Sequence, residues 1–293
     1  MKTLITGSTG FVGQAVLKEL TACGLSEELV LLSSRKNDNY PTCIYQLDGD
    51  RYTWDLPQDI DCLIHIGAWT PKSVKDFQDT DKGFGNITFT RSLLHSLPNL
   101  KRLVFISTID VYAPTKEPIS ENSLVKPISI YGYSKLYCEE MVKAWSEQHN
   151  ISCCVLRLGH IYGVGEAAYK KLIPMLIQQA LKGETINIYS AGNELRSFLN
   201  IEDCAKVIVQ AGKSGASGLF NVVSGNPVSV KQIAETIKRL TGSNCEIVIQ
   251  NRSVETRDMV FDNSKLLETF PLEEKILEQG LTEEIDYFKN LAV

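Results

Sequence analysis

The chain has 293 residues, of which 43% are hydrophobic and 22% are charged, with a formal net charge of −5. This composition is typical of a soluble globular protein, and the absence of a basic run and of a long apolar stretch disfavours nucleic-acid and membrane partners. Eight scattered cysteines without a Cys-x-x-Cys pattern, four histidines without metal-ligand spacing and an N-terminus with no room for a signal peptide predict a cytoplasmic protein without a metal site.

The first predicted elements are a strand, a tight glycine turn and a helix. Residues 2–6 are apolar or β-branched, three glycines spaced three apart follow, and residues 12–20 form an amphipathic pattern. Glycines in such a turn permit the bend, the approach of a pyrophosphate and helix–strand packing, while the helix N-terminus faces the anion. We therefore expect dinucleotide contacts from Gly7, Thr9, Gly10, Phe11, Val12 and Gly13.

The second predicted strand, residues 29–32, ends in Ser33, Ser34 and Arg35. NAD-binding folds of this type carry an acidic residue here that bonds the ribose 2′-hydroxyl, whereas an arginine suits a 2′-phosphate. Because no acid is present, and Ser34 and Arg35 can both donate to a phosphate, the sequence favours NADP(H) over NAD(H). A solvent-exposed basic loop is the alternative interpretation.

The third predicted strand, residues 63–66, lies between further candidate contacts to the dinucleotide. Asp55 and Leu56 precede it and are placed to flank an adenine, although an acid there by chance is a comparable interpretation. The residues after the strand begin with two small ones, which would let a cofactor pass close to the backbone: Gly67, Ala68 and Trp69.

A helix over residues 86–97 leads to an apolar strand, residues 103–106, and another strand is predicted over residues 153–158. Such fully apolar strands are typical of a parallel sheet that is buried on both faces. Thr108 and Asp110 follow the strand at 103–106. Because ligands bind at the carboxyl edge of such a sheet, both are candidate site residues.

A helix is predicted to begin near Tyr131, where Tyr131 and Lys135 share one face. A free phenol has a pKa of roughly 10, and a neighbouring ammonium lowers it, so this pair can exchange a proton with a substrate oxygen. An exposed Tyr–Lys pair without a catalytic role is the alternative. A second pair at this spacing, Tyr112 and Lys116, encloses Pro114 and is not expected to be helical.

The character of the chain changes after Gly165. We expect a dinucleotide-binding domain over residues 1–165 and a smaller lobe over residues 166–293, with some segments near 199–225 expected to return to the first domain. The alternation of strands and helices in the first part predicts an α/β fold with a doubly wound parallel sheet. In the second part helices are predicted over residues 169–181, 200–211, 228–240 and most of 272–291, with strands at 186–189, 219–223 and 246–249.

With these pieces in order, the chain resembles the extended short-chain dehydrogenase/reductases, specifically the NAD(P)-dependent nucleotide-sugar epimerase, dehydratase and reductase group. The resemblance covers nearly the whole chain and includes Asn86. Its other motifs lie at residues 6–13, 65–68, 105–112, 131–135, 156–163, 196–203 and 220–225.

The resemblance implies a Rossmann-like fold with a C-terminal lobe that binds the nucleotide sugar. In that family the tyrosine, here Tyr131, is the acid/base for a hydroxyl or ketone oxygen of the sugar, and the residue at the position of Thr108 hydrogen-bonds the same oxygen. The lysine, here Lys135, holds the nicotinamide ribose. Arg196 matches an arginine that meets the pyrophosphate, and Arg252 or Arg257 would supply a second cation. Relatives are commonly homodimers through the helices near residues 86–97 and 131–147.

Three departures from the family pattern bear on the reaction. The acid after the second strand is absent, and His160 stands where many relatives have an asparagine that touches substrate, so it either contacts substrate or packs. The family's 4,6-dehydratases carry Thr-Asp-Glu where this chain has Thr108, Ile109 and Asp110, so one of the two acids is missing.

These departures favour an NADP(H)-dependent reductase of a 4-keto-6-deoxy nucleotide sugar. An NAD-dependent nucleotide-sugar epimerase is the first alternative. A 4,6-dehydratase and a non-catalytic redox sensor are weaker ones.

Overall fold

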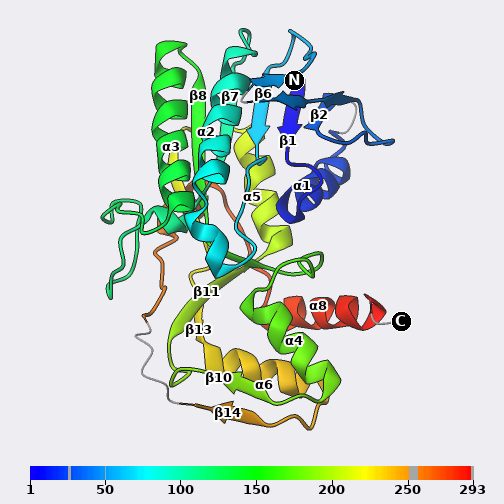
Figure 1. The fold of residues 1–293 in the computed structure, drawn as a ribbon, viewed down its shortest axis with the longest axis vertical. Coiled ribbons are helices and arrows are strands. Elements are labelled where there is room, and N and C mark those ends of the chain that lie inside the picture. Colours follow the sequence, from blue (N-terminus) through cyan, green and yellow to red (C-terminus); the bar gives the residue numbers. More distant parts are fainter. Residues whose placement is uncertain (26–27, 50, 251–256, 292–293) are drawn as a thin grey trace.

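The computed structural model describes residues 1–25, 28–49, 51–250 and 257–291, and a seven-stranded parallel sheet forms its larger part (Figure 1). The strand order is β12-β8-β7-β6-β1-β2-β3, which confirms the predicted doubly wound α/β class. The strands are β1 (Thr3–Thr6), β2 (Leu29–Ser33), β3 (Thr42–Ile44), β6 (Cys62–His65), β7 (Arg102–Thr108), β8 (Ser152–Leu158) and β12 (Gly218–Val222).

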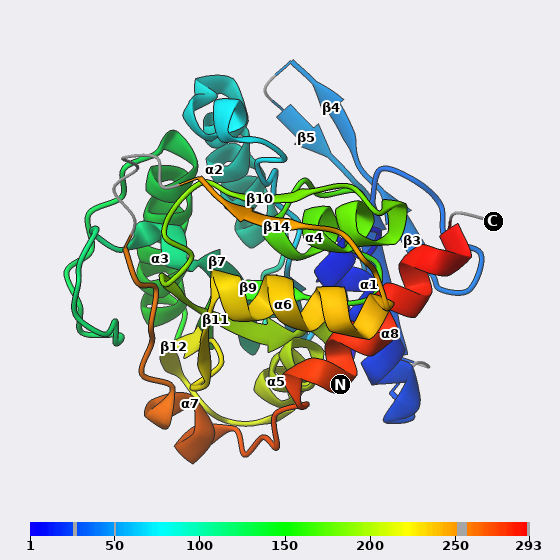
Figure 2. The same cartoon turned by 90° about the horizontal axis from the view of Figure 1, so that it is seen from below.

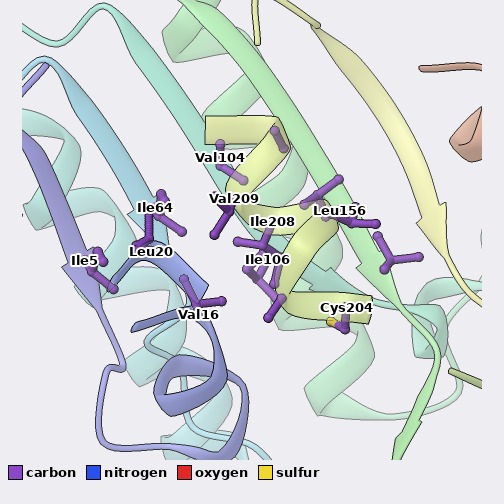
Figure 3. Packing of buried hydrophobic residues seen from close by; sticks show 14 of the residues in the cluster. Ile5, Val16, Leu20, Ile64, Val104, Ile106, Leu156, Cys204, Ile208 and Val209 are labelled. Atoms are coloured by element: carbon purple, nitrogen blue, oxygen red, sulfur yellow. The ribbon is translucent and has the colours of Figure 1, made fainter. Parts of the chain in front are cut away.

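Helices cover both faces of this sheet because alternate strand residues point to opposite sides. One face packs on α1 (Phe11–Ala22) and α5 (Ile201–Lys213), as Figure 3 shows for Ile5, Ile64 and Val104. The other face packs on α2 (Thr80–His95) and α3 (Ile130–Gln148). Its side chains are the residues next to those three in the same strands, namely Leu4, Leu63 and Leu103. Each such buried aliphatic side chain contributes about 1.5–3 kcal/mol.

The smaller lobe lies beyond the carboxyl ends of the sheet strands (Figure 1). Its apolar core joins α4, α6 and α8 with the short strand pair β10–β14. The three-stranded sheet β13-β11-β9 lies between this core and the large sheet, and α7 follows β14 in the chain (Figure 2). The bounds are α4 (Leu172–Lys182), α6 (Val230–Thr241), α7 (Ser264–Thr269), α8 (Leu277–Leu291), β9 (His160–Tyr162), β10 (Ile186–Ile188), β11 (Leu195–Asn200), β13 (Pro227–Ser229) and β14 (Ile247–Ile249).

Several elements differ from the sequence predictions. The helix predicted at 86–97 begins at Thr80, because the Asp79 side chain accepts a hydrogen bond from the Lys82 amide and caps it there. The helix predicted from 169 begins at Leu172, so Pro174 lies in its first turn, where a missing amide costs no hydrogen bond. The chain between β3 and β6 forms an unpredicted hairpin of β4 (Gln46–Asp48) and β5 (Arg51–Thr53).

Strand β12, at residues 218–222, pairs with β8 at one edge of the large sheet. The segment near 199–225 thus contributes α5 and β12 to the larger body. Within the described ranges, no helix has the length and apolar character needed to cross a bilayer.

Candidate active site

The glycine turn brings the N-terminus of α1 to the carboxyl edge of the sheet. Gly7 has a φ of +73°, a conformation that favours glycine, and the Gly10 amide donates to the Gly7 carbonyl at 3.0 Å. A Cβ on Gly13 would lie 2.1 Å from that carbonyl oxygen, so this close packing excludes any other residue. The turn therefore leaves the free amides of the first helical turn facing outward, as a dinucleotide pyrophosphate requires.

A cleft of about 980 Å³ runs from the glycine turn to the smaller lobe. Most of the residues that the sequence singled out line it: Gly7, Thr9, Gly10, Phe11, Val12, Gly13, Ser34, Gly67, Ala68, Trp69, Asn86, Thr108, Asp110, Tyr131, Lys135, His160 and Arg196. Four candidates are not in the lining formed by the described residues, namely Arg35, Asp55, Leu56 and Arg257. Leu56 is buried in the core instead, and Arg35 and Asp55 are exposed.

Asn86 fixes the backbone segment that follows β6. Its Oδ1 accepts from the Trp69 amide at 2.7 Å, and its Nδ2 donates to the Trp69 carbonyl at 3.1 Å. The segment is held at its start by Thr6, whose Oγ1 accepts from the Gly67 amide at 2.8 Å. Asn86 therefore holds in place the backbone of residues 67–69, the part of the cleft wall that the sequence predicts to contact the cofactor.

Tyr131 lies in the first turn of α3, which the Ser129 side chain caps by accepting from the Gly132 amide at 3.0 Å. Its ring is flanked edge-on by Trp69 and Phe77, with ring centroids 6.1 and 6.0 Å away. Tyr131 is almost fully buried at the wall of the cleft, which places its phenol among protein groups rather than in bulk water.

The pKa of Tyr131 is raised, which corrects the expectation that Lys135 lowers it. Burial is the main cause, and the nearby Asp110 carboxylate adds to it, because both disfavour a phenolate. Hydrogen bonds involving Thr70 and Thr108 act in the opposite direction and offset the shift only in part. Tyr131 is therefore a neutral phenol in this state of the protein.

Lys135 is buried one turn after Tyr131. Its Nζ donates to the Ile106 carbonyl at 2.5 Å and lies 4.3 Å from the centre of the Phe105 ring. Burial lowers the pKa of Lys135 to about 8, although the charge of Glu139 opposes the shift. The ammonium is thus held at the end of β7, where the site's hydroxyl groups lie.

Thr108 and Asp110 form a small hydrogen-bonded unit at the end of β7. The Thr108 hydroxyl donates to Asp110 Oδ2 at 3.1 Å, and the Asp110 amide donates back to Thr108 Oγ1 at 3.2 Å. Burial raises the pKa of Asp110, while the Thr108 bond and the charge of Arg257 act against that shift. Ile109, between them, offers no polar side-chain group.

The three-stranded sheet contributes His160, on β9, and Arg196, on β11, to the cleft. Burial lowers the pKa of His160 to about 4, and its ring packs 5.5 Å from Phe198, so it both packs and faces the cleft as a neutral imidazole. Arg196 Nη1 donates to the Arg257 carbonyl at 2.7 Å, which brings the two candidate cations together. Arg252 lies outside the described residues.

Sequence reasoning missed cleft residues that come from loops and from the hairpin. Lys171 Nζ pairs with Glu166 at 3.1 Å and lies 5.1 Å from the Phe11 ring, which ties the loop after β9 to the glycine turn. Thr70 and Phe77 approach Tyr131 from the loop after β6. Thr70 ends the run of residues after the third strand where the sequence predicted that a cofactor passes, but no sequence pattern marked Phe77 or Lys171.

Comparison with known proteins agrees with this architecture. Residues 3–223 match the model of the NAD dependent epimerase/dehydratase family. A putative UDP-glucose 4-epimerase of Methanocaldococcus jannaschii is 25% identical over 304 residues, which cover 98% of each chain. A trifunctional UDP-glucose 4,6-dehydratase/UDP-4-keto-6-deoxy-D-glucose 3,5-epimerase/UDP-4-keto-L-rhamnose-reductase of Arabidopsis thaliana is 26% identical, and this chain spans about half (47%) of its length and 97% of its own.

Solved structures show the same fold. A UDP-glucose 4-epimerase of Thermotoga maritima with UDP-glucose has a TM-score of 0.85 at 22% identity and is covered completely in both chains. A UDP-glucuronic acid 4-epimerase of Bacillus cereus in complex with NAD has a TM-score of 0.84 at 24% identity, with 99% of this chain and 97% of that chain covered. Since the family model matches three quarters of the sequence, the chain belongs to the NAD dependent epimerase/dehydratase family.

Proposed function

We propose that the protein uses a nicotinamide dinucleotide to act at C4 of a nucleotide sugar, and that it is a 4-epimerase. The observation that carries the proposal is the meeting of Thr108, Tyr131 and Lys135 in the cleft that starts at the glycine turn. The similar proteins are named mostly as UDP-sugar 4-epimerases, which favours this alternative over the reductase that the sequence placed first.

The residues of the cleft fit a dinucleotide with its pyrophosphate at the glycine turn, where only glycine can occupy position 13. Its nicotinamide end would lie toward Tyr131 and Lys135, and Lys135 would donate to the ribose. A nucleotide sugar would enter from the smaller lobe, with its diphosphate held by Arg196, which lines the cleft. Arginine suits this contact because its planar fork can bond two phosphate oxygens.

Tyr131 handles the proton in the proposed reaction. When bound, a nicotinamide would supply both the acceptor and the donor of the hydride at the sugar carbon. Tyr131 takes the proton of the 4-hydroxyl as the ketone forms and gives it back to the same oxygen when the ketone is reduced. Thr108 would turn its one O–H from Asp110 Oδ2 to that oxygen and so hold it beside the phenol. Inversion requires that the ketone present its other face before reduction.

The raised pKa of Tyr131 sets a condition on this chemistry. A neutral phenol can protonate a ketone oxygen directly, but it must lose its proton before it can accept one. Lys135, one helical turn after Tyr131 and with a pKa of about 8, is the cation on this helix face that could stabilise that phenolate. A bound substrate that separates Asp110 from Tyr131 would remove one of the two causes of the shift.

A reductase remains the second candidate, on one specific observation. The cleft wall at the end of β2 contains Ser33 and Ser34, with Arg35 next in the chain and no acid in this stretch. This end favours a 2′-phosphate, and NADPH is the usual donor for net reduction. Ile109, in the position of an acid, disfavours a 4,6-dehydratase, because removal of water from a hexose needs an acid as well as a base.

The deciding experiment is to incubate the protein with UDP-glucose, UDP-glucuronic acid and their C4 epimers, and separately with NADPH and a nucleotide 4-keto-6-deoxyhexose. Exchange between C4 epimers without net use of NAD(P)H supports the epimerase. Oxidation of NADPH by the keto sugar promotes the reductase. Binding of a dinucleotide with no turnover and no sugar-nucleotide binding would contradict both and favour the redox sensor.

We also propose a homodimer through α2 and α3. These helices carry large apolar side chains that are more than half exposed in the single chain, namely Phe84, Tyr133 and Tyr137. A second copy would bury them and gain about 25 cal/mol for each Å² of apolar surface removed from water. Sedimentation equilibrium tests this, and Tyr137→Glu should shift the protein toward monomer if the helices form the interface.

A further inference from the structure

His65, the last residue of β6, is buried beneath the wall of the cleft. Its side chain is 2% exposed, and its ring centroid lies 5.6 Å from the rings of both Phe89 and Phe105. It is paired in the sheet register with Thr6 on β1, so the two side chains lie side by side on one face of the sheet. An imidazole in such an apolar layer needs a partner for each ring nitrogen.

Both ring nitrogens of His65 have a hydroxyl partner. Nδ1 lies 2.7 Å from Thr6 Oγ1, and Nε2 lies 3.0 Å from Thr90 Oγ1 on α2. Thr6 Oγ1 in turn accepts from the Gly67 amide at 2.8 Å. The Thr90 hydroxyl donates to the Asn86 carbonyl, also at 2.8 Å. A continuous chain of buried hydrogen bonds therefore runs from residue 67 to residue 86.

One tautomer of His65 satisfies the whole chain. The Thr90 hydroxyl has a single hydrogen, which goes to the Asn86 carbonyl, so Nε2 must carry the ring hydrogen and donate to Thr90 Oγ1. Nδ1 is then the acceptor for the Thr6 hydroxyl. In the other tautomer the Thr6 hydrogen would lose this acceptor, and Thr90 would have to serve two acceptors with one hydrogen. Burial, together with the charge of Lys135, lowers the pKa of His65 to about 3, so the ring is neutral.

Asn86 closes this chain into a ring. Its side chain holds the Trp69 amide and carbonyl at 2.7 and 3.1 Å. The segment of residues 67–69 is thus held at the Gly67 amide and at Trp69, and His65 joins the two holds. These three residues line the cleft, and the Trp69 ring packs edge-on against that of Tyr131 at 6.1 Å.

We propose that His65, as the Nε2–H tautomer, is a positioning residue that holds residues 67–69 in place against the bound dinucleotide. It acts without touching cofactor or substrate, through Thr6 on one side and Thr90 on the other. Because every bond of the ring is buried, a broken bond leaves a polar group unpaired instead of exchanging it with water, and the wall shifts to pair it again. The inference rests on the proposed function only in requiring that the chain bind a dinucleotide.

The first test reads the tautomer directly in the folded protein. The combined substitutions His95→Gln, His149→Gln and His160→Gln leave His65 as the one histidine of the chain. Nitrogen NMR of protein with labelled histidine then reports which ring nitrogen carries the hydrogen. We expect a protonated Nε2 and an unprotonated Nδ1 at neutral pH, with no change down to about pH 5. An Nδ1–H tautomer, or a mixture of the two, would overturn the proposal.

The second test breaks the ring at Thr90. Thr90→Val removes the acceptor of Nε2 at nearly the same shape, and Thr90→Ser keeps it. Thr88→Val is the matched control on α2, because the Thr88 hydroxyl bonds the carbonyls of Phe84 and Gly85 in its own helix. Calorimetry measures dissociation constants for NAD, NADP and UDP.

We expect Thr90→Val to weaken the dinucleotides by about threefold to tenfold, the scale of one buried hydrogen bond, and to give a mixture of His65 tautomers. UDP affinity should stay the same, because the nucleotide sugar enters from the other lobe. Thr90→Ser and Thr88→Val should bind all three ligands as the wild type does.

Unchanged dinucleotide affinity in Thr90→Val, or equal weakening by Thr88→Val, would overturn the positioning role. Equal loss of UDP and dinucleotide affinity in Thr90→Val would also overturn it, since that is the result of a general loss of structure. A wild type that binds neither dinucleotide would overturn this role and the proposed function together. A wild type that shows the expected pattern but converts no nucleotide sugar would contradict the proposed function and support the role of His65.

Discussion

Glu139 and Arg157 form an ion pair that is buried on both sides, with Arg157 Nη2 2.6 Å from Glu139 Oε2 and Nε 2.9 Å from Oε1. The Ser107 hydroxyl donates to the same carboxylate at 2.5 Å. Glu139 lies one turn after Lys135 on α3, and Ser107 precedes Thr108 on β7. The pair therefore joins the helix that carries Lys135 to the two strands that end at the site.

Glu139→Gln should destabilise the protein by about 3–5 kcal/mol, because it leaves the buried charge of Arg157 without its partner. Glu140→Gln is the matched control on the same helix. It removes an exposed pair with Lys143 and should cost at most about 1 kcal/mol. Denaturant unfolding measures both free energies, and equal effects of the two variants would contradict a structural role for the buried pair.

Tyr131→Phe should lower turnover by at least ~10²-fold, the usual scale for a general acid or base, because it removes one oxygen and keeps the ring packing. Cofactor affinity should barely change, whereas Lys135→Ala should reduce both turnover and cofactor affinity. Tyr189→Phe, at a half-exposed tyrosine that is not in the cleft lining formed by the described residues, is the control and should behave as wild type. Steady-state kinetics with a nucleotide sugar that the wild type converts measures turnover of each variant. Normal turnover of Tyr131→Phe would refute its assignment as the acid/base.

The parts of the site that could be predicted from sequence are local patterns. Gly7 and Gly13 are required by one turn, and Ser129 with the apolar positions after it is enough to begin α3 beside Tyr131. The direction of the Tyr131 pKa shift could not be predicted from the helix alone. It depends on burial and on Asp110, which comes from β7.

The hairpin and the Lys171 loop were missed for another reason. Strands β4 and β5 have three residues each, too few to show a clear alternation, and their face is defined by contact with Phe89 on a distant helix. Lys171 gains its place through Glu166 and Phe11, far apart in the chain. Such positions follow from tertiary packing, which the sequence pattern does not encode locally.

Arg35→Asp should weaken NADPH selectively, by about tenfold to a hundredfold, because a charge-assisted contact to the 2′-phosphate is lost and repulsion replaces it. NADH affinity should stay the same or improve. Lys36→Asp makes the same charge change at the next exposed position and should have a much smaller effect. Fluorescence titration with both cofactors measures the preference. Tighter binding of NADH than NADPH by the wild type would assign the site to NAD, as in the structural relatives that were solved with it.

Glu284 on α8 lies beside Glu166, which lines the cleft, and both carboxyl groups are almost fully buried. Burial and the neighbouring Glu166 charge raise the pKa of Glu284 to about 9, while the charge of Lys171 and a hydrogen bond involving the Gly163 backbone oppose the shift. The raised pKa means that Glu284 holds a proton in the folded protein, while Glu166 keeps its contact with Lys171.

This pair predicts a stability that falls as pH rises. The ordinary pKa of a glutamate is roughly 4.3, so between about pH 5 and pH 9 the folded state holds a proton on Glu284 that the unfolded state has lost. Folding then takes up a proton, and the free energy of unfolding decreases with pH by at most about 1.4 kcal/mol per pH unit from this group.

Glu284→Gln keeps the side-chain volume and cannot ionise, so it should flatten the dependence of the free energy of unfolding on pH. Relative to the wild type, it should be most stabilising near pH 9. Glu283→Gln, which removes an exposed partner of Lys275, should leave the slope unchanged. Denaturant unfolding at several pH values measures the slopes, and equal slopes for wild type and Glu284→Gln would show that Glu284 is not protonated in the folded protein.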